Sequence, residues 1–300
     1  MIFKNNKELK QKDFKNEKEL QNYFEANLER FLGLKFIDTE FWINNHKFRI
    51  DTLAYDEESC SFRIIEYKNI KNHSLVDQGY TYLKQLLENK ADFVLQYNLK
   101  TGKSLSIPDI DWTQSRIIFV SPIFSNYQLN ATDFKNIPVD LVKVTKYEDE
   151  IIEIDKIQKT SNVTVEELET IDSELNKVSR EVKVYTEEDH LNNRPDKIKN
   201  LYEMLRERIM ELDDIDLEVK KNYVAFKGRT NIVDVEFSNS KMRLDINMKK
   251  GTLDDPKNLC EDLTLHGHWG NGDYRYFVSE EENIDTAIGF IKQSLKVNKK

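Results

Sequence analysis

Two largely apolar segments of the N-terminal half, residues 48–55 and 62–69, contain three residues whose types could do chemistry together. Asp51 lies in the first segment, and Glu66 and Lys68 lie in the second. Side chains alternate along a β-strand, so Glu66 and Lys68 share one face with the apolar residues two and four positions earlier. A carboxylate and an ammonium group on an apolar face contradict the local pattern, as functional sites often do.

These residue types fit the hydrolysis of a phosphodiester. If the two segments form a hairpin, Asp51 and Glu66 lie about 5 Å apart across the strands. Two carboxylates at that separation repel each other unless a cation lies between them, and Mg²⁺ (or Mn²⁺) accepts such oxygen ligands together with water and phosphate oxygens. The metal would lower the pKa of a bound water, while Lys68 would orient that water and offset charge on the phosphorane.

The surrounding pattern predicts an α/β layer that could position these residues. Apolar residues recur at helical spacing over residues 17–31, with Gly33 as a C-terminal cap, and the turn at residues 56–59 favours a hairpin between the two strands. The remaining expected elements are a helix over 74–89, strands at Phe93–Tyr97 and Arg116–Val120, and β-rich alternation over 139–158.

The order Asp51, a gap of fourteen residues, then Glu66-Tyr67-Lys68 resembles the D…(D/E)xK signature of the PD-(D/E)XK nuclease superfamily. Asp51 follows Ile50 instead of the proline in the superfamily's name, a common departure. The resemblance implies a restriction-endonuclease-like αβββαβ core and an Mg-dependent endonuclease, with Asp51 and Glu66 as metal ligands and Lys68 as a catalytic residue.

Further residues match elements of that superfamily. On the preceding helix, Glu19 (or Glu25) resembles its helical acidic residue and would join the metal ligands. On the following helix, Gln78 and Tyr82 resemble its Q-x-x-x-Y element, and their spacing of four places both on one helix face. Gln78 would be catalytic, positioning water or phosphate, and Tyr82 would be accessory. Glu40 either approaches the metal or ends a strand.

Structural alternatives exist for each of these residues. Glu66 and Lys68 could be a solvent-facing pair with Ile65 and Tyr67 turned to the core, because alternation alone does not identify the buried face. Asp51 could stabilise a neighbouring arginine or a turn. Glu19 could be solvated on a charged helix, and Tyr82 could serve packing alone.

Charge and length indicate two domains joined by an acidic segment. The 300-residue chain has a formal net charge of −9. Residues 161–190 contain nine acidic and three basic residues, whereas the flanking regions are close to neutral. We therefore expect a nuclease-like domain at 1–160, an acidic helical linker at 161–190 and an α+β domain at 191–300. Neither flank is basic, so the usual electrostatic footprint of a DNA-binding protein is missing.

The C-terminal region predicts a helix after Pro195, strands at Leu217–Phe226, Ile232–Phe237, Met242–Met248 and Tyr274–Val278, and a last helix at Ile284–Leu295. It resembles a domain of unknown function that accompanies nuclease-like halves in uncharacterised bacterial proteins. His266, His268 and Trp269 could line a ligand pocket or bind a metal. A glycine-rich turn with exposed histidines is the structural alternative.

Two functions from different classes remain open. One is a metal-dependent nuclease acting on nucleic acid, with DNA as the expected polymer. The other is a catalytically silent nucleic-acid-binding or regulatory protein on the same scaffold. Residues 191–300 would bind an unidentified ligand or protein, and a homodimer is a further candidate assembly. Two distant cysteines and the lack of a signal peptide or apolar span favour a cytoplasmic protein without a membrane partner.

Overall fold

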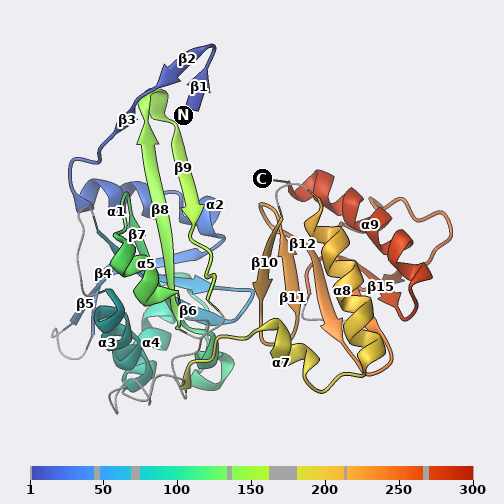
Figure 1. Ribbon diagram of the computed structural model, residues 1–300. Helices are drawn as coiled ribbons and strands as arrows, with labels where there is room; N and C mark the ends of the chain where they lie inside the picture. Colours follow the sequence, from blue (N-terminus) through green and yellow to red (C-terminus); the bar gives the residue numbers. More distant parts are fainter. Residues whose placement is uncertain are drawn as a thin grey trace. The chain divides into compact units, whose positions relative to one another are not determined.

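The chain forms two compact units, Met1–Val184 and Tyr185–Lys300. The computed structural model describes residues 2–43, 48–68, 75–133, 137–161, 181–212, 215–265 and 270–299 (Figure 1). The division falls within the predicted acidic linker, of which residues 162–180 lie outside the described residues. Val182 packs into the core of the first unit, and a helix of the second unit begins at Glu187.

The first unit is built on a seven-stranded mixed sheet with the strand order β3-β8-β7-β6-β5-β4, and β9 pairs with β8. Strands β4, β5 and β6 are antiparallel, whereas β6, β7 and β8 are parallel. The short strands β1 and β2 form a separate ribbon near the far end of β8 and β9 (Figure 1). The bounds are β1 Ile2–Lys4, β2 Lys7–Leu9, β3 Gln11–Lys12, β4 Lys35–Ile43, β5 Phe48–Asp56, β6 Ser61–Tyr67, β7 Arg116–Ser121, β8 Val139–Tyr147 and β9 Ile152–Lys156.

Helices cover both faces of this sheet. The residues Phe24 and Leu28 of α1 and α2 pack on one face against Tyr67, while Leu83 and Phe93 of α3 and α4 pack on the other. The mixed α/β class expected from the sequence is therefore confirmed. The bounds are α1 Glu17–Glu25, α2 Leu28–Leu32, α3 Leu75–Glu88, α4 Lys90–Thr101 and α5 Asn126–Thr132, with 3₁₀ turns at Ile107–Asp109, Trp112–Gln114 and Glu148–Glu150.

A glycine allows α3 to approach the sheet closely. A β-carbon at Gly79 would lie 3.1 Å from methyl groups of both Ile117 on β7 and Val139 on β8. That distance is tighter than ordinary packing, so a side chain there would push the helix outward. Gly79 therefore fixes the depth of α3, which carries Gln78 and Tyr82.

The expected strand at Phe93–Tyr97 is wrong, because these residues lie within helix α4. Phe93, Val94 and Tyr97 are buried, whereas Leu95 and Leu99 are exposed, which is a helical face and not a strand face. The helix ends at Gly102, whose φ of 68° lies in the left-handed region. A short apolar run does not distinguish a buried strand from a buried helix segment.

Two other expected elements are each divided in the structure. The helix over residues 17–31 breaks at Ala26 and Asn27, where the Asn27 side chain donates a hydrogen bond of 2.9 Å to the backbone oxygen of Tyr23. Gly33 caps the second piece with a φ of 70°, as predicted. The expected strand at Leu217–Phe226 is two strands, β10 and β11, joined by a turn.

The second unit is a six-stranded antiparallel sheet of order β10-β11-β12-β13-β15-β14. Residues Leu205 of α8 and Ile291 of α9 pack in one core with Val235 of the sheet. The bounds are α7 Glu187–Leu191, α8 Asp196–Met210, β10 Asp216–Val219, β11 Val224–Lys227, β12 Asn231–Phe237, β13 Met242–Ile246, β14 Glu261–Asp262, β15 Tyr274–Val278 and α9 Glu282–Asn298.

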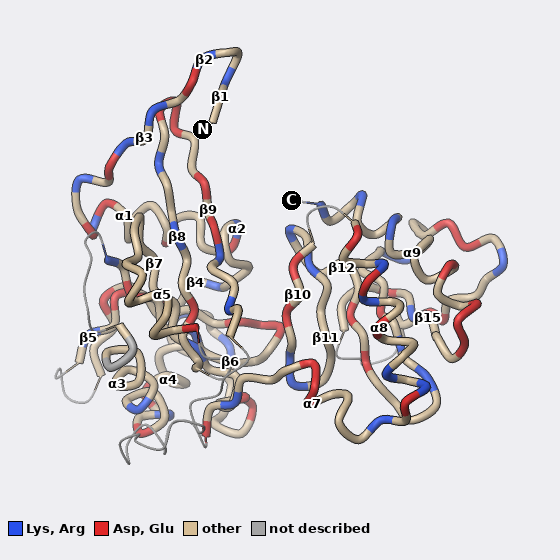
Figure 2. The backbone as a smooth tube through the Cα atoms, in the orientation of Figure 1, with Lys and Arg blue, Asp and Glu red and all other residues tan. Residues whose placement is uncertain are grey.

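Acidic and basic residues are interspersed along the chain in both units (Figure 2). Within the described part of the chain, no helix combines the length and the apolar character that crossing a membrane requires.

Candidate functional site

The candidate site lies where β5 separates from β6. Pairing of these strands runs from Asp56 and Ser61 to Thr52 and Ile65, and stops there. The next positions along the two strands are Asp51 and Glu66. Because β6 continues alongside β7 while β5 turns away, the two carboxylates face each other where the ladder opens. We call this opening the carboxylate notch, defined by Asp51, Glu66 and Lys68.

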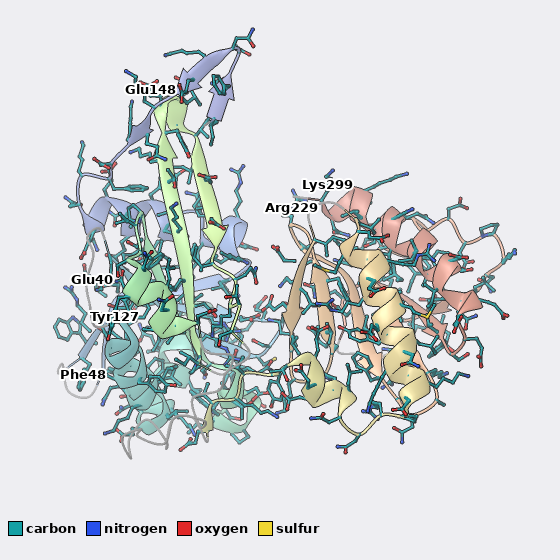
Figure 3. The ribbon with its side chains drawn as sticks, viewed as in Figure 1. Glu40, Phe48, Tyr127, Glu148, Arg229 and Lys299 are labelled. Carbon is teal, nitrogen blue, oxygen red and sulfur yellow. The ribbon has the colours of Figure 1, made fainter. Side chains whose placement is uncertain are left out.

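A backbone distortion in the neighbouring strand accompanies this opening. Glu40 on β4 (labelled in Figure 3) has a φ of 49°, in the left-handed region that side chains other than glycine rarely adopt. Thr39 pairs with Thr52 and Phe41 with Ile50, so Glu40 lies across from Asp51 without a ladder pair. Such conformations cost about 1–3 kcal/mol and concentrate at functional sites. The expectation that Glu40 ends a strand is wrong, because β4 continues to Ile43.

Each carboxylate of the notch accepts a backbone N–H from the other strand. The N–H of Asp51 donates to Oε1 of Glu66 at 3.1 Å, and the N–H of Tyr67 donates to Oδ2 of Asp51 at 3.2 Å. Nζ of Lys68 lies 3.5 Å from Oε2 of Glu66. The backbone N–H of Lys68 donates to the carbonyl of Val120 at 2.9 Å, which fixes the end of β6 against β7.

Burial shifts the protonation of both carboxyl groups. The Glu66 side chain is 2% exposed and the Lys68 side chain 14% exposed, so they are not a solvent-facing pair. Burial and repulsion by Asp51 raise the pKa of Glu66 to about 7, and Lys68 offsets only part of that rise. Burial also raises the pKa of Asp51, an effect that the Tyr67 N–H, Lys68 and Arg49 partly counter and Glu17 reinforces. The charged forms of both carboxylates are therefore disfavoured, mainly by burial, and the neighbouring cations offset this only in part.

Helix α1 supports the notch from one side of the sheet. The buried Gln21 donates through Nε2 to the backbone oxygen of Asp51 at 2.8 Å and to Oε1 of Glu25 at 2.9 Å. Glu25 also accepts a hydrogen bond from the hydroxyl of Thr52 at 2.5 Å, and the oxygen of that hydroxyl lies 3.3 Å from the hydroxyl of Tyr67. Glu25, the second candidate for the helical acid, thus accepts hydrogen bonds from Gln21 and Thr52, the residues that contact or adjoin Asp51.

Glu19, the first candidate for the helical acid, is paired elsewhere. Its Oε1 lies 2.9 Å from Nζ of Lys146 on β8, and its Oε2 accepts the backbone N–H of Lys15 at 2.6 Å. These contacts lower the pKa of Glu19. On the same helix, Glu17 is close enough to Asp51 to raise the pKa of that carboxyl. Of the acids on α1, Glu17 is the one that raises the pKa of Asp51, as the smallest of the effects on that group.

Basic side chains lie at the outer border of the notch. Nζ of Lys18 lies 2.6 Å from Oε1 of Glu40 and lowers the pKa of that carboxyl. The guanidinium of Arg49 lies 3.8 Å from Oε2 of Glu40 and 3.9 Å from Oδ1 of Asp51. Arg49 does approach Asp51, as the structural alternative expected, but it is half exposed and the distance is long for a strong pair.

Helix α3 brings Tyr82 and Gln78 to the other side of Glu66. The Tyr82 hydroxyl donates to the backbone oxygen of Arg49 at 3.0 Å, and Glu66 and Gln78 lie close enough to influence its pKa. Burial raises the pKa of Tyr82, so the hydroxyl stays protonated. The ring also packs against the core, so packing and site roles coexist in this residue.

The donor set of the notch suits a hard divalent cation with few protein ligands. Across the described residues, no cluster of three or more His, Cys, Asp or Glu side chains is arranged to hold a metal ion. The notch offers two carboxylates with raised pKa values, and a cation would stabilise their charged forms. Mg²⁺ uses one or two carboxylates with water and phosphate oxygens, so these residues fit it.

The glycine-rich segment of the C-terminal unit was the second candidate site. His266, His268 and Trp269 lie outside the described residues. Asp273, near them in the sequence, accepts the backbone N–H of Lys250 at 2.7 Å through Oδ2.

A relative shares almost the whole of this chain. An uncharacterized protein of Haemophilus influenzae (strain Rd) is 42% identical over 291 residues, which cover 96% of this chain and 96% of that protein. The chain belongs to the same family as this protein. In addition, residues 187–298 of the present chain match the Domain of unknown function (DUF5655). The expectation of such a domain in the C-terminal half is confirmed.

Two solved structures show a weak likeness to the chain described here. One is described as the structure of an EndoMS-dsDNA2 complex, with 18% identity, a TM-score of 0.28, and coverage of 39% of this chain and 40% of that one. The other is a repair endonuclease from Pyrococcus abyssi, with 18% identity, a TM-score of 0.24, and coverage of 41% and 45%. The chain spans less than half of either structure, and TM-scores this low support no argument about function.

Two residues near the notch were not identified from the sequence: Glu17 and Gln21. Glu17 and Gln21 are four apart on α1, the spacing that places two side chains on one helix face. A polar pair at that spacing on an otherwise apolar stripe is the signal that could have found them. Arg49 was expected only as the structural alternative partner of Asp51, which it approaches to 3.9 Å.

Proposed function

We propose that the N-terminal unit is a metal-dependent nuclease of the PD-(D/E)XK type, which hydrolyses phosphodiester bonds with DNA as the expected polymer. The observation that carries the proposal is the pair of buried carboxylates, Asp51 and Glu66, facing each other at an opened ladder with Lys68 beside them. The element order of helix, three antiparallel strands, helix and a parallel strand supports the restriction-endonuclease-like αβββαβ core.

In this proposal Asp51 and Glu66 hold Mg²⁺ or Mn²⁺, with the charge of Glu17 as a more distant contribution. The bound cation supplies charge that polarises the phosphodiester and lowers the pKa of a water molecule. Lys68 orients the attacking water and offsets charge on the phosphorane. Gln78 positions water or phosphate, and Tyr82 holds the backbone of Arg49 in place through its 3.0 Å hydrogen bond.

The test is a cleavage panel with the full chain and Mg²⁺ or Mn²⁺, on single-stranded, duplex, nicked, branched and mismatched DNA and on RNA. We expect the wild type to cleave at least one substrate, and Asp51→Asn and Lys68→Met to lose about 10²–10⁴-fold in rate. Asp38→Asn and Lys100→Met are matched controls, because this pair lies 2.8 Å apart between β4 and α4. The proposal would be refuted if the control variants lost as much cleavage rate as the notch variants, or if the wild type cleaved no substrate.

A second candidate is a catalytically silent binding or regulatory protein on the same scaffold. The observation that favours it is that both carboxylates already accept backbone N–H groups, of Asp51 and of Tyr67, which is a structural role. The near-neutral charge of both flanking regions points the same way. This candidate predicts an intact fold, no cleavage of any substrate and no divalent-ion binding that depends on Asp51.

A further inference from the structure

A tryptophan on the end strand of the sheet lies beside the carboxylate notch. Trp42 is on β4, and the residue is 47% exposed. It is the register partner of Arg49 on β5, so the two side chains emerge next to each other from adjacent strands. Arg49 is also half exposed. We call these two residues the Trp42 platform.

A single exposed apolar residue is common on protein surfaces and needs no explanation by itself. The Trp42 platform differs because cations and the notch border it. The guanidinium of Arg49 lies 3.9 Å from Oδ1 of Asp51, and Lys18 lies 2.6 Å from Glu40, which Arg49 also approaches. An aromatic ring with neighbouring cations is the combination that proteins use for single strands: bases stack on the ring and cations attract the phosphates.

The spacing also fits a nucleotide bound next to the notch. Arg49 and Asp51 are two residues apart on β5, about 7 Å along the strand. A base on the ring of Trp42 would therefore leave its phosphate near Arg49 and a neighbouring phosphodiester near Asp51. Bases inside a duplex are stacked on one another, so only an unpaired, terminal or extruded base offers its face to a protein ring.

We propose that Trp42 and Arg49 bind an unpaired nucleotide next to the carboxylate notch, which makes single-stranded segments of DNA the substrate of this site. The inference rests on the proposed nuclease function for its catalytic meaning, but the binding that it predicts requires no catalysis. Trp42 is a binding and specificity residue in this account.

The test measures binding to the full chain in EDTA, so that no cleavage occurs, by fluorescence anisotropy of labelled oligo-dT and of a blunt duplex of equal length. We expect oligo-dT to bind more tightly than the duplex. Trp42→Ala should weaken oligo-dT binding by about 5- to 150-fold, the value of one stacked base, and Trp42→Phe should restore most of it. Phe36→Ala is the matched control, because Phe36 is 41% exposed on the same strand. It should bind as the wild type does.

Cleavage in Mn²⁺, measured separately, distinguishes failure of this inference from failure of the proposed function. A wild type that binds oligo-dT through Trp42 but cleaves nothing would refute the nuclease and leave the platform as a binding site. The platform is refuted, whatever cleavage shows, if Trp42→Ala binds oligo-dT like the wild type while melting at the same temperature. It is equally refuted if the wild type prefers the blunt duplex or binds neither.

Discussion

Both units place carboxylates at buried strand positions, but those of the carboxylate notch are neutralised differently from the others. In the first unit itself, Asp56 on β5 lies 2.6 Å from the guanidinium of the buried Arg63. In the second unit, Asp245 on β13 meets Arg275 on β15 through two hydrogen bonds, of 2.6 Å to Oδ1 and 2.8 Å to Oδ2. Glu236 on β12 lies 2.8 Å from the guanidinium of Arg243. In the carboxylate notch, by contrast, the nearest cations among the described residues lie 3.5 Å from Glu66 and 3.9 Å from Asp51.

This difference separates a structural network from a candidate site. A bidentate guanidinium satisfies both oxygens of a carboxylate in a fixed geometry, so Asp245 and Arg275 have no need of a further ligand. The notch carboxylates face each other instead, and the pKa of each is raised. A buried acid alone is therefore weak evidence for chemistry. An acid whose charge its neighbours leave uncompensated is stronger evidence.

The largest expected effect on stability is in the second unit. Arg275→Met should destabilise the protein by about 3–5 kcal/mol, because it leaves the buried charge of Asp245 without its partner. Urea unfolding monitored by circular dichroism measures the change. Arg208→Met removes the exposed partner of Asp285 and should cost less than about 1 kcal/mol. Equal losses in the free energy of unfolding in the two variants would show that Arg275 does not compensate the buried charge of Asp245.

In the carboxylate notch, removing a charged group is expected to raise the stability of the protein instead of lowering it. Glu66→Gln should stabilise the metal-free protein by about 1–4 kcal/mol at pH 8, because it removes a buried charge that its surroundings disfavour. The pKa of Glu66 rises from 4.5 to about 7 on folding, so the folded state holds the extra proton between these values. Stability of the wild type should therefore fall as the pH rises through this window.

Thermal melting at pH 5 and at pH 8 measures this effect in the wild type and in Glu66→Gln. The variant should lack the part of the pH dependence that falls between 4.5 and about 7. A Glu66→Gln protein that is less stable than the wild type at pH 8 would mean that the carboxylate stabilises the notch through the Asp51 N–H instead.

The sequence predicted the notch better than it predicted the elements around it. The alternation of Ile64, Glu66 and Lys68 on one strand face, and the hairpin that brings Asp51 beside them, depend on local pattern alone. Helix α4 was not predicted, because its apolar run Phe93–Tyr97 suits a strand or a helix and only tertiary packing decides between them.

The helical acid shows a second limit of sequence reasoning. Glu17, Glu19 and Glu25 all lie on α1, and nothing local distinguishes their roles. Residues distant in the sequence decide the role of each acid. Lys146 of β8 forms an ion pair with Glu19, and the hydroxyl of Thr52 of β5 donates a hydrogen bond to Glu25. The left-handed conformation of Glu40 likewise has no sequence signal, because it follows from the strand distortion opposite Asp51.

The smallest expected effect concerns these helical acids. Glu17→Gln should weaken Mn²⁺ binding about 2- to 5-fold, a modest change because this exposed charge is screened by solvent. Glu19→Gln should leave the affinity for Mn²⁺ unchanged, because Glu19 is paired with Lys146. Calorimetric titration of both variants compares them directly. A larger loss of Mn²⁺ affinity in Glu19→Gln than in Glu17→Gln would mean that Glu19 is the helical acid, as expected from the sequence.

The most direct test of the central claim is calorimetric titration of Mn²⁺ into the full chain at pH 7, in two buffers of different ionisation enthalpy. The account predicts one divalent-ion site in the wild type, with release of protons, because the pKa of Glu66 near 7 leaves that carboxyl partly protonated before the metal binds. Asp51→Asn should lose the site, and Asp38→Asn should keep it. A wild type that binds no Mn²⁺, or a site that Asp51→Asn leaves intact, would contradict the claim that the notch is a metal centre.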